Sequence, residues 1–168
     1  MKIGILSDSH GKKARLIAAM KTLAERRVEA IVHCGDVGSA RCVRMLGSNS
    51  RGAYLVAGNM DRDVEELCVA AEESGVHFSG EVIEVPIGSG RYLVATHGHD
   101  EDILGELVAE QQFPYVCHGH THRIRDQRIG KARVINPGAL CHPRDPRYPT
   151  VAVLDTEADA LEYIPLPH

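Results

Sequence analysis

The chain has 168 residues, of which 43% are hydrophobic and 25% charged, as expected for one globular domain that folds alone. The net charge of −4 and the absence of tryptophan argue against a general nucleic-acid binder. The five cysteines form no Cys-x-x-Cys pair, and no leader or membrane-length apolar run is recognisable. We therefore predict a single domain over residues 1–168 of a cytoplasmic protein with reduced thiols and no membrane partner.

The first half of the chain alternates short apolar runs with amphipathic segments. The pattern predicts strands over 3–6, 30–34 and 53–57, and helices over 12–27, 40–46 and 64–73. This alternation is typical of βαβ units and a parallel sheet. Each strand ends in polar residues: Asp8 and His10, then Asp36, then Asn59. Because ligands of such sheets gather beyond the carboxyl ends of the strands, we expect these side chains to meet.

The second half predicts hairpins, one further helix and several more strands. The expected strands cover 82–87, 91–96, 113–117, 123–129, 131–135, 151–154 and 161–164, with a helix over 101–111 and turns at 88–90 and 136–138. The helix has Ile103, Leu104, Leu107 and Val108 on its inward face. This order fits two sheets packed face to face, with helices outside, better than one doubly wound sheet.

Two of these strands end in histidine clusters. His97 and His99 follow one strand, and the next leads into His118-Gly119-His120-Thr121-His122. In an extended chain alternate side chains share a face, so we expect His120 and His122 to point the same way. Two imidazoles directed at one point indicate a metal site, with a solvated polar turn as an equal alternative for this motif alone. The recurrence of similar polar strand ends decides between the two.

Taken together, the ends of five strands form a candidate metal site. Its seven members are Asp8, His10, Asp36, Asn59, His97, His120 and His122. Each has an ordinary structural explanation, such as a helix cap, an Asx turn or a core histidine, but their recurrence at matching strand ends favours a site. Oxygen and nitrogen donors without a thiolate favour Mn²⁺, Fe²⁺, Co²⁺, Ni²⁺ or Zn²⁺. Seven donors exceed the needs of one four-coordinate ion and suit two ions about 3.5–4 Å apart that share a bridging carboxylate. A hydroxide held between two such ions could attack a phosphate ester.

The motifs themselves resemble a known family. Asp8-Ser9-His10, Gly35-Asp36, Gly58-Asn59-Met60-Asp61, His97-Gly98-His99 and Gly119-His120-Thr121-His122 resemble the motifs of the calcineurin-like metallophosphoesterases. The short chain, and Asn136-Pro137-Gly138 followed by Pro143-Arg144, are similar to the small bacterial and archaeal phosphodiesterases. The resemblance implies an α/β fold, a four-layer α-β-β-α sandwich of two mixed sheets flanked by helices.

The resemblance also implies a division of roles. Asp8, His10, Asp36 and His122 would hold one divalent ion; Asp36 would bridge to a second ion, completed by Asn59, His97 and His120. Manganese is the first expectation, with nickel, iron, cobalt and zinc as alternatives. Asp61 would orient the ligands without binding metal. Asp36, Asn59 and His99 are the predicted catalytic residues.

One departure from the family concerns the leaving-group acid. Many larger relatives carry a histidine, and small relatives often a cysteine, where this chain has Met60. Methionine donates no proton, so substrates with basic leaving groups need another acid. His99 is the nearest candidate, with a solvated side chain or one that supports the ligands as the alternative. Ala139 replaces a serine that relatives often have.

The remaining polar residues receive weaker interpretations. A local basic cluster follows the histidines and consists of Arg123, Arg125, Arg128, Lys131 and Arg133. The favoured interpretation is a solvated hairpin surface, and the alternative is a patch that steers anionic substrates toward the site. Cys34 and Cys117 are interpreted as buried small hydrophobes rather than nucleophiles. His33, His77, His142 and His168 receive no role.

The sequence thus predicts a binuclear metal-dependent phosphodiesterase acting on a small phosphodiester. The alternative from another class is a protein-binding scaffold of the same fold, like the small retromer subunit, because a fold by itself does not give activity. A phosphomonoesterase is a further alternative, against which Met60 counts. Small relatives are often dimers or tetramers, so a homodimer or homotetramer is expected; nucleic acid is not indicated as a partner.

Overall fold

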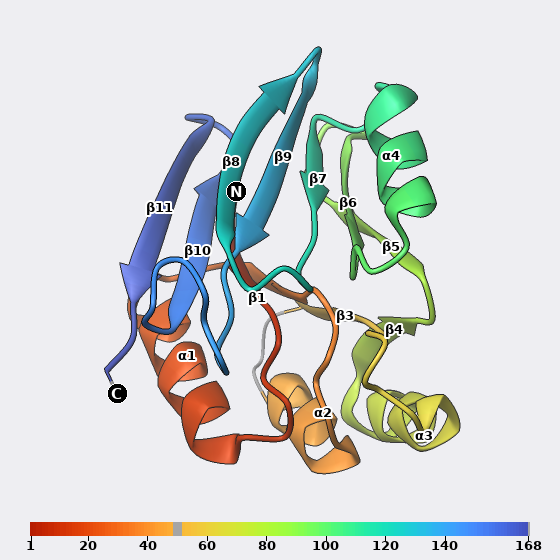
Figure 1. The fold of residues 1–168 in the computed structure, drawn as a ribbon, viewed down its shortest axis with the longest axis vertical. Coiled ribbons are helices and arrows are strands. Elements are labelled where there is room, and N and C mark those ends of the chain that lie inside the picture. The colour runs from red at the N-terminus through yellow and green to blue at the C-terminus, as the bar shows by residue number, and fades with distance from the viewer. Residues whose placement is uncertain (49–51, 168) are drawn as a thin grey trace.

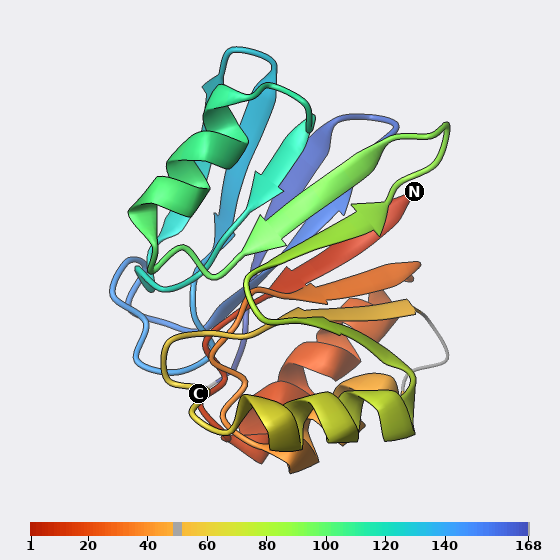
Figure 2. The ribbon, with the colours of Figure 1, turned by 90° about the vertical axis from the view of Figure 1, so that its right-hand side faces the viewer.

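Two mixed β-sheets pack face to face, and helices cover the outer face of each (Figure 2). The computed structural model describes residues 1–48 and 52–167. The helices between residues 13 and 74 lie against one sheet, and the helix over residues 101–109 lies against the other (Figures 1 and 2). The predicted four-layer α-β-β-α sandwich is therefore confirmed.

The larger sheet carries the βαβ units of the first half of the chain. Its strand order is β11 (Ala160–Pro165), β10 (Thr150–Asp155), β1 (Lys2–Leu6), β2 (Ala30–His33), β3 (Gly52–Val56) and β4 (Val76–Ser79). Strands β1 to β4 are parallel, whereas β10 runs antiparallel to β1 and to β11. Its outer face is covered by α1 (Lys13–Glu25), α2 (Ala40–Gly47) and α3 (Val64–Ser74) (Figure 1).

The smaller sheet is formed by the second half of the chain. Its strand order is β5 (Val82–Pro86), β6 (Tyr92–Thr96), β7 (Tyr115–Cys117), β9 (Ala132–Pro137) and β8 (Ile124–Ile129). Strands β6, β7 and β9 are parallel, and the two edge strands are antiparallel to their neighbours. Helix α4 (Glu101–Ala109) packs its half-buried Leu104 and Leu107 against this sheet, as its predicted inward face requires.

The main apolar layer lies between the two sheets. Ile3 and Ile5 of β1 and Val32 of β2 are fully buried there with Leu93 of β6 and Ile135 of β9. Each such side chain contributes roughly 1.5–3 kcal/mol when fully buried. Because helices cover the other face of the sheet, β1 and β2 are buried on both sides and appear in the sequence as unbroken apolar runs.

Two sequence expectations about secondary structure were wrong. Strand β4 was not predicted, because it is a four-residue edge strand of mixed polarity that starts directly after the left-handed Gly75 ending α3. The expected turn at 136–138 begins only at Gly138, since Asn136 and Pro137 still pair with β8 as the last residues of β9. A proline is tolerated at that strand end because its missing N–H removes no interior ladder bond.

Over residues 1–48 and 52–167, no helix combines the length and the apolar character that spanning a bilayer requires.

Candidate metal centre

The loops that follow β1, β2, β3, β6 and β7 converge on one side of the two sheets, at the left in Figure 2. These loops carry all seven predicted metal ligands. Backbone hydrogen bonds join the first two loops, from Asp8 N to Gly35 O at 3.1 Å and from His10 N to Asp36 O at 2.9 Å. Both sheets therefore contribute to one site at the carboxyl ends of their parallel strands.

The backbone of the site is strained. Asp8, His10, Asp36, His120 and His122 all have φ between +44° and +63°, the left-handed region that L side chains rarely adopt. Each such residue costs roughly 1–3 kcal/mol, and such residues persist where the surrounding structure holds them for function. Strand β7 ends at Cys117, so the expectation that His120 and His122 lie on one face of an extended segment was wrong.

The first group of ligand atoms surrounds the Asp8 carboxylate. Asp8 Oδ1 lies 3.1 Å from His122 Nε2 and 3.9 Å from His10 Nε2. One ligand atom from each of these three residues fits within 4.8 Å of the others, which is close enough for a single ion. Asp8 is completely buried and its Oδ1 accepts no hydrogen bond from the described residues. Such an orphaned carboxylate oxygen is costly unless a cation faces it.

The second group surrounds His97. Its Nε2 lies 3.4 Å from Asp36 Oδ2 and 3.0 Å from Asn59 Oδ1, and Asn59 Oδ1 lies 3.2 Å from His120 Nδ1. Asp8, Asp36 and His97 also have ligand atoms within 4.8 Å of one another. All seven predicted residues therefore lie in one cluster made of two adjoining groups.

Hydrogen bonds from the far side of two rings determine which nitrogen faces the site. The Nδ1–H of His97 donates to Cys34 O at 2.8 Å, and the Nδ1–H of His122 donates to His142 O at 2.9 Å. In the neutral rings Nε2 then presents a lone pair to the carboxylate oxygens of Asp36 and Asp8. Electron-pair donors that face one another at this distance need a proton or a metal between them, and these oxygen and nitrogen donors fit a divalent cation.

The acidities of these groups reflect the same arrangement. Burial is the largest influence on the pKa of Asp8 and of Asp36 and raises both, but the neighbouring groups together, chiefly His122 for Asp8 and His97 for Asp36, outweigh it, and both pKa values lie below the usual value of 3.8. Asp8 raises the pKa of His122, and Asp36 raises that of His97 despite the opposing effect of burial. Both carboxylates are therefore charged at neutral pH and available to a metal.

Asp61 joins two of the loops without entering the cluster. Its Oδ2 accepts from Val37 N at 3.2 Å and Gly58 N at 2.9 Å, and its Oδ1 accepts from Gly38 N at 2.8 Å. The carboxylate thus holds the loop after β2 against the loop after β3. This geometry fits the predicted role of Asp61, which is to orient its neighbours rather than to bind metal.

An open pocket of about 520 Å³ lies over the cluster. Besides predicted ligands and the exposed Met60, it is lined by Lys12, His142 and Arg144, to which the sequence analysis assigned no role in the site. His142 and Arg144 reach the pocket because the β9–β10 loop crosses to the loop after β1, where Cys141 N donates to Asp8 O at 3.0 Å. No sequence spacing indicates that contact.

The predicted acid His99 lies at the rim. It is exposed, and its ring centre is 5.5 Å from that of His97 and 6.2 Å from that of His120. It does not line the pocket over the cluster. The acid role of His99 stays a prediction.

His33, one of the four histidines without a predicted role, and His118 are both buried. His33 Nε2 lies 2.9 Å from Ser9 Oγ, and His118 is held by Gly119 O and Asn136. Burial lowers the pKa of each to about 4. His77 is exposed and stacks on Tyr54, whereas His168 lies outside the described residues.

The cysteines and the basic hairpin match their structural interpretations. Cys34 and Cys117 are fully buried, which raises both thiol pKa values and fits small hydrophobes.

In the basic cluster, Arg133 pairs with Asp126 at 2.7 Å and with Asp159 at 2.9 Å. Arg128 also pairs with Asp159. These pairs favour the solvated hairpin surface over a steering patch.

Comparison with known proteins identifies the family of the chain. The family model for the calcineurin-like phosphoesterase superfamily domain matches residues 1–159. The chain belongs to this superfamily. A phosphodiesterase of Methanocaldococcus jannaschii is 29% identical over 160 residues, which cover 94% of each chain. These matches confirm the family to which the sequence motifs pointed and support a hydrolase.

Solved structures agree with the family assignment. An archaeal phosphodiesterase superposes on this phosphoesterase with a TM-score of 0.88 at 28% identity, covering 99% of this chain and all of the other. Vacuolar Protein Sorting 29 from Cryptosporidium parvum superposes with a TM-score of 0.67 at 20% identity, covering 97% and 95%. The second likeness is one of fold alone.

Proposed function

We propose that this phosphoesterase is a binuclear metal-dependent phosphodiesterase. The observation that carries the proposal is the position of one oxygen atom. Asp36 Oδ2 lies 3.9 Å from His10 Nε2 and 3.4 Å from His97 Nε2, so a single carboxylate oxygen faces both groups of donors. This position supports Asp36 as the bridge between an ion held with Asp8, His10 and His122 and an ion held with Asn59, His97 and His120.

Two divalent ions, with manganese as the first candidate, would supply charge neutralisation and a nucleophile for in-line displacement at phosphorus. The chain's own residues prepare the site for a phosphate ester. Lys12 and Arg144 bring positive charge to the pocket wall, which favours an anionic substrate. Asn59 and His120 line the pocket beside Met60, where the phosphoryl group of the substrate would lie.

Met60 also bears on substrate preference. Its side chain is 49% exposed at the pocket, in the position where relatives place a proton donor. A thioether neither donates a proton nor carries a charge, so it assists no basic leaving group. We therefore favour a small phosphodiester over a monoester as the substrate.

The test is turnover of an aryl phosphodiester and its monoester by protein stripped with chelator and refilled with Mn²⁺, Ni²⁺, Zn²⁺ or Mg²⁺. We expect metal-restored cleavage of the diester to exceed that of the monoester by at least about 10-fold in kcat/KM. A preference for the monoester would make the protein a phosphomonoesterase.

The alternative function is a protein-binding scaffold, and the likeness in fold to Vacuolar Protein Sorting 29 is the observation that favours it. A protein-binding scaffold does not need seven converged donors on a strained backbone, which is why we prefer the enzyme. Folded protein that cleaves neither ester with any of the four metals would decide for the scaffold.

Replacing His99 by glutamine tests the missing acid. If His99 protonates the leaving group, turnover of an alkyl diester should fall by roughly 10²-fold, whereas an aryl diester with an acidic leaving group should lose little. Metal content should not change, because His99 belongs to neither donor group. Steady-state kinetics on both esters measures the difference, with the exposed His77→Gln as the matched control. An equal effect on both esters would remove His99 from proton transfer.

A further inference from the structure

A second cavity adjoins the candidate metal centre. It has a volume of about 470 Å³, and Lys12 and His142 line both this cavity and the pocket over the cluster. Its walls are the first turn of α1 and the loop between β9 and β10, which lie beside each other in Figure 1. The ring centre of His142 is 6.1 Å from that of His10, so the junction of the two spaces lies close to the metal ligands.

The second cavity is basic. Lys12, Arg15 and Arg147 line it, and Arg144 lies in the adjoining pocket. No carboxylate lines the second cavity, and the only one lining the adjoining pocket is that of Asp36. Arg15 donates to the backbone oxygen of Pro167 at 2.8 Å. Within residues 1–48 and 52–167, none of these four cations has a carboxylate oxygen within 4.0 Å.

This concentration of charge is unusual for the protein. The chain as a whole carries a net charge of −4, and Arg128 and Arg133 of the β8–β9 hairpin are paired with Asp159 and Asp126. The cations of the cavity are left for an external anion. Lys12 and Arg15 both line the cavity beside the buried Cys141, so the two cations face one space.

We infer that this cavity binds a second phosphate of the substrate, so that the substrate is a phosphodiester with a further phosphate group beside the scissile one. Guanidinium groups bind phosphate through paired, charge-assisted hydrogen bonds, and Arg15 and Arg147 supply two of them. The volume suits a phosphorylated sugar or nucleoside. The inference rests on the proposed phosphodiesterase function and deepens it, since it names the feature by which a natural diester would be recognised.

The experiment compares substrates that differ by one phosphate. A dinucleotide with a single diester bond is assayed unmodified and with a terminal phosphate at its 5′ or its 3′ end. With the wild-type protein we expect one terminal phosphate to raise kcat/KM by about 10-fold. The gain should shrink as ionic strength rises, because salt screens exposed charges.

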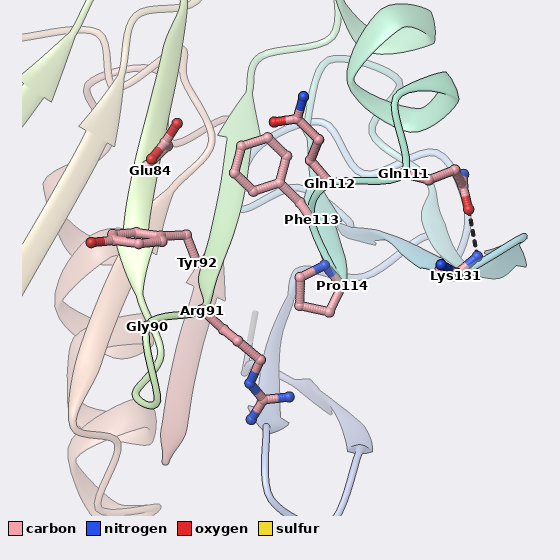
Figure 3. A pocket seen from close by; sticks show the side chains of 9 residues that line it. All are labelled: Glu84, Gly90, Arg91, Tyr92, Gln111, Gln112, Phe113, Pro114 and Lys131. Atoms are coloured by element: carbon pink, nitrogen blue, oxygen red, sulfur yellow. Dashed lines mark hydrogen bonds between the residues drawn. The ribbon is translucent and has the colours of Figure 1, made fainter.

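Variants locate the effect in the cavity. Arg147→Gln and Arg15→Gln should each reduce the gain from the terminal phosphate, and the double variant should abolish it. The matched control is Arg91→Gln, since Arg91 lines a separate cavity with Glu84 and Tyr92 (Figure 3) and should keep the full gain. Arg147 is exposed on a loop, so its replacement leaves the packed core intact.

A binding measurement gives a readout that does not depend on turnover. Calorimetry compares a nucleoside 3′,5′-bisphosphate with the corresponding monophosphate on the same metal-loaded protein. We expect the bisphosphate to bind about 10-fold tighter, and this advantage to disappear in the double variant but not in Arg91→Gln.

The outcomes separate this inference from the function on which it rests. An aryl diester that is not cleaved with any metal would overturn the phosphodiesterase proposal itself. Cleavage of the aryl diester, with no gain from either terminal phosphate or a gain that survives the double variant, would overturn only the second phosphate site. A trinucleotide without terminal phosphates tests whether the second phosphate can be an internal one. If the natural substrate is an oligonucleotide, the trinucleotide should show the same arginine-dependent gain in kcat/KM; if it is a smaller molecule, only the terminal phosphate should give that gain. An arginine-dependent gain from the internal or the terminal phosphate supports the site.

Discussion

Asp36→Asn should lose both metal ions and at least about 10³-fold of the phosphodiester turnover. Asp36 is 3% exposed, and its Oδ2 faces His10 Nε2 and His97 Nε2, one from each donor group. In the wild-type protein Met60 N donates to Asp36 Oδ1 at 2.8 Å. The asparagine side chain keeps an oxygen that can accept this hydrogen bond, so the substitution should preserve the loop. It replaces the charged oxygen with an amide group that no metal accepts as a bridge.

Elemental analysis of the dialysed variant and turnover of the aryl diester measure the two losses together. The matched control is Asp102→Ala, which removes an exposed carboxylate in the first turn of α4 and should keep metal content and turnover. An Asp36→Asn protein that retains two ions per chain would contradict the bridging role.

Acidification of the metal-free protein should remove about 3 kcal/mol of unfolding free energy for each of His33 and His118. Both rings are buried, at 0% and 2% exposure, and burial lowers the pKa of each from 6.5 to about 4. Between these pH values the unfolded chain binds a proton that the folded chain does not. The stabilisation is therefore complete above pH 6.5 and is lost as the pH falls toward 4.

The hydrogen-bonding pattern gives the same direction. His33 Nδ1 and His118 Nε2 are buried without a hydrogen-bond partner among the described residues. Protonation would place an unsatisfied N–H and a positive charge in the interior, which is unfavourable. Because a small domain has only about 5–15 kcal/mol of stability, the two residues together bring the metal-free protein close to unfolding at pH 4.

Denaturant titrations at several pH values on chelator-stripped protein measure the slope. Each of His33→Gln and His118→Gln should reduce it by about 1.4 kcal/mol per pH unit near pH 5. The exposed His77→Gln should leave the slope unchanged and serves as the control. An unaltered slope in both buried-histidine variants would show that other groups cause the acid sensitivity.

The sequence by itself determined the layered architecture and the seven donor residues that converge in the cluster. Short apolar runs such as 3–6 and 30–34 alternate along the chain with segments whose apolar residues recur at helical spacing. The spacing of apolar residues distinguishes strand from helix without knowledge of contacts. Since parallel strands present their carboxyl ends at one edge, residues such as Asp8, Asp36 and Asn59 could be assigned to one site before their distances were known. The family resemblance added the ligand roles, which stay predictions.

Only the tertiary structure decided how these residues face one another. The left-handed backbone of His120 and His122 is imposed by packing against neighbouring loops, and local sequence preference does not reveal it. The basic cavity is lined by Lys12 and Arg15, at the start of α1, and by Arg147 of the β9–β10 loop. Contacts across more than 130 residues depend on which strands pair and where the β9–β10 loop crosses. Sequence periodicity carries no such information, because it records only which face of each element is buried.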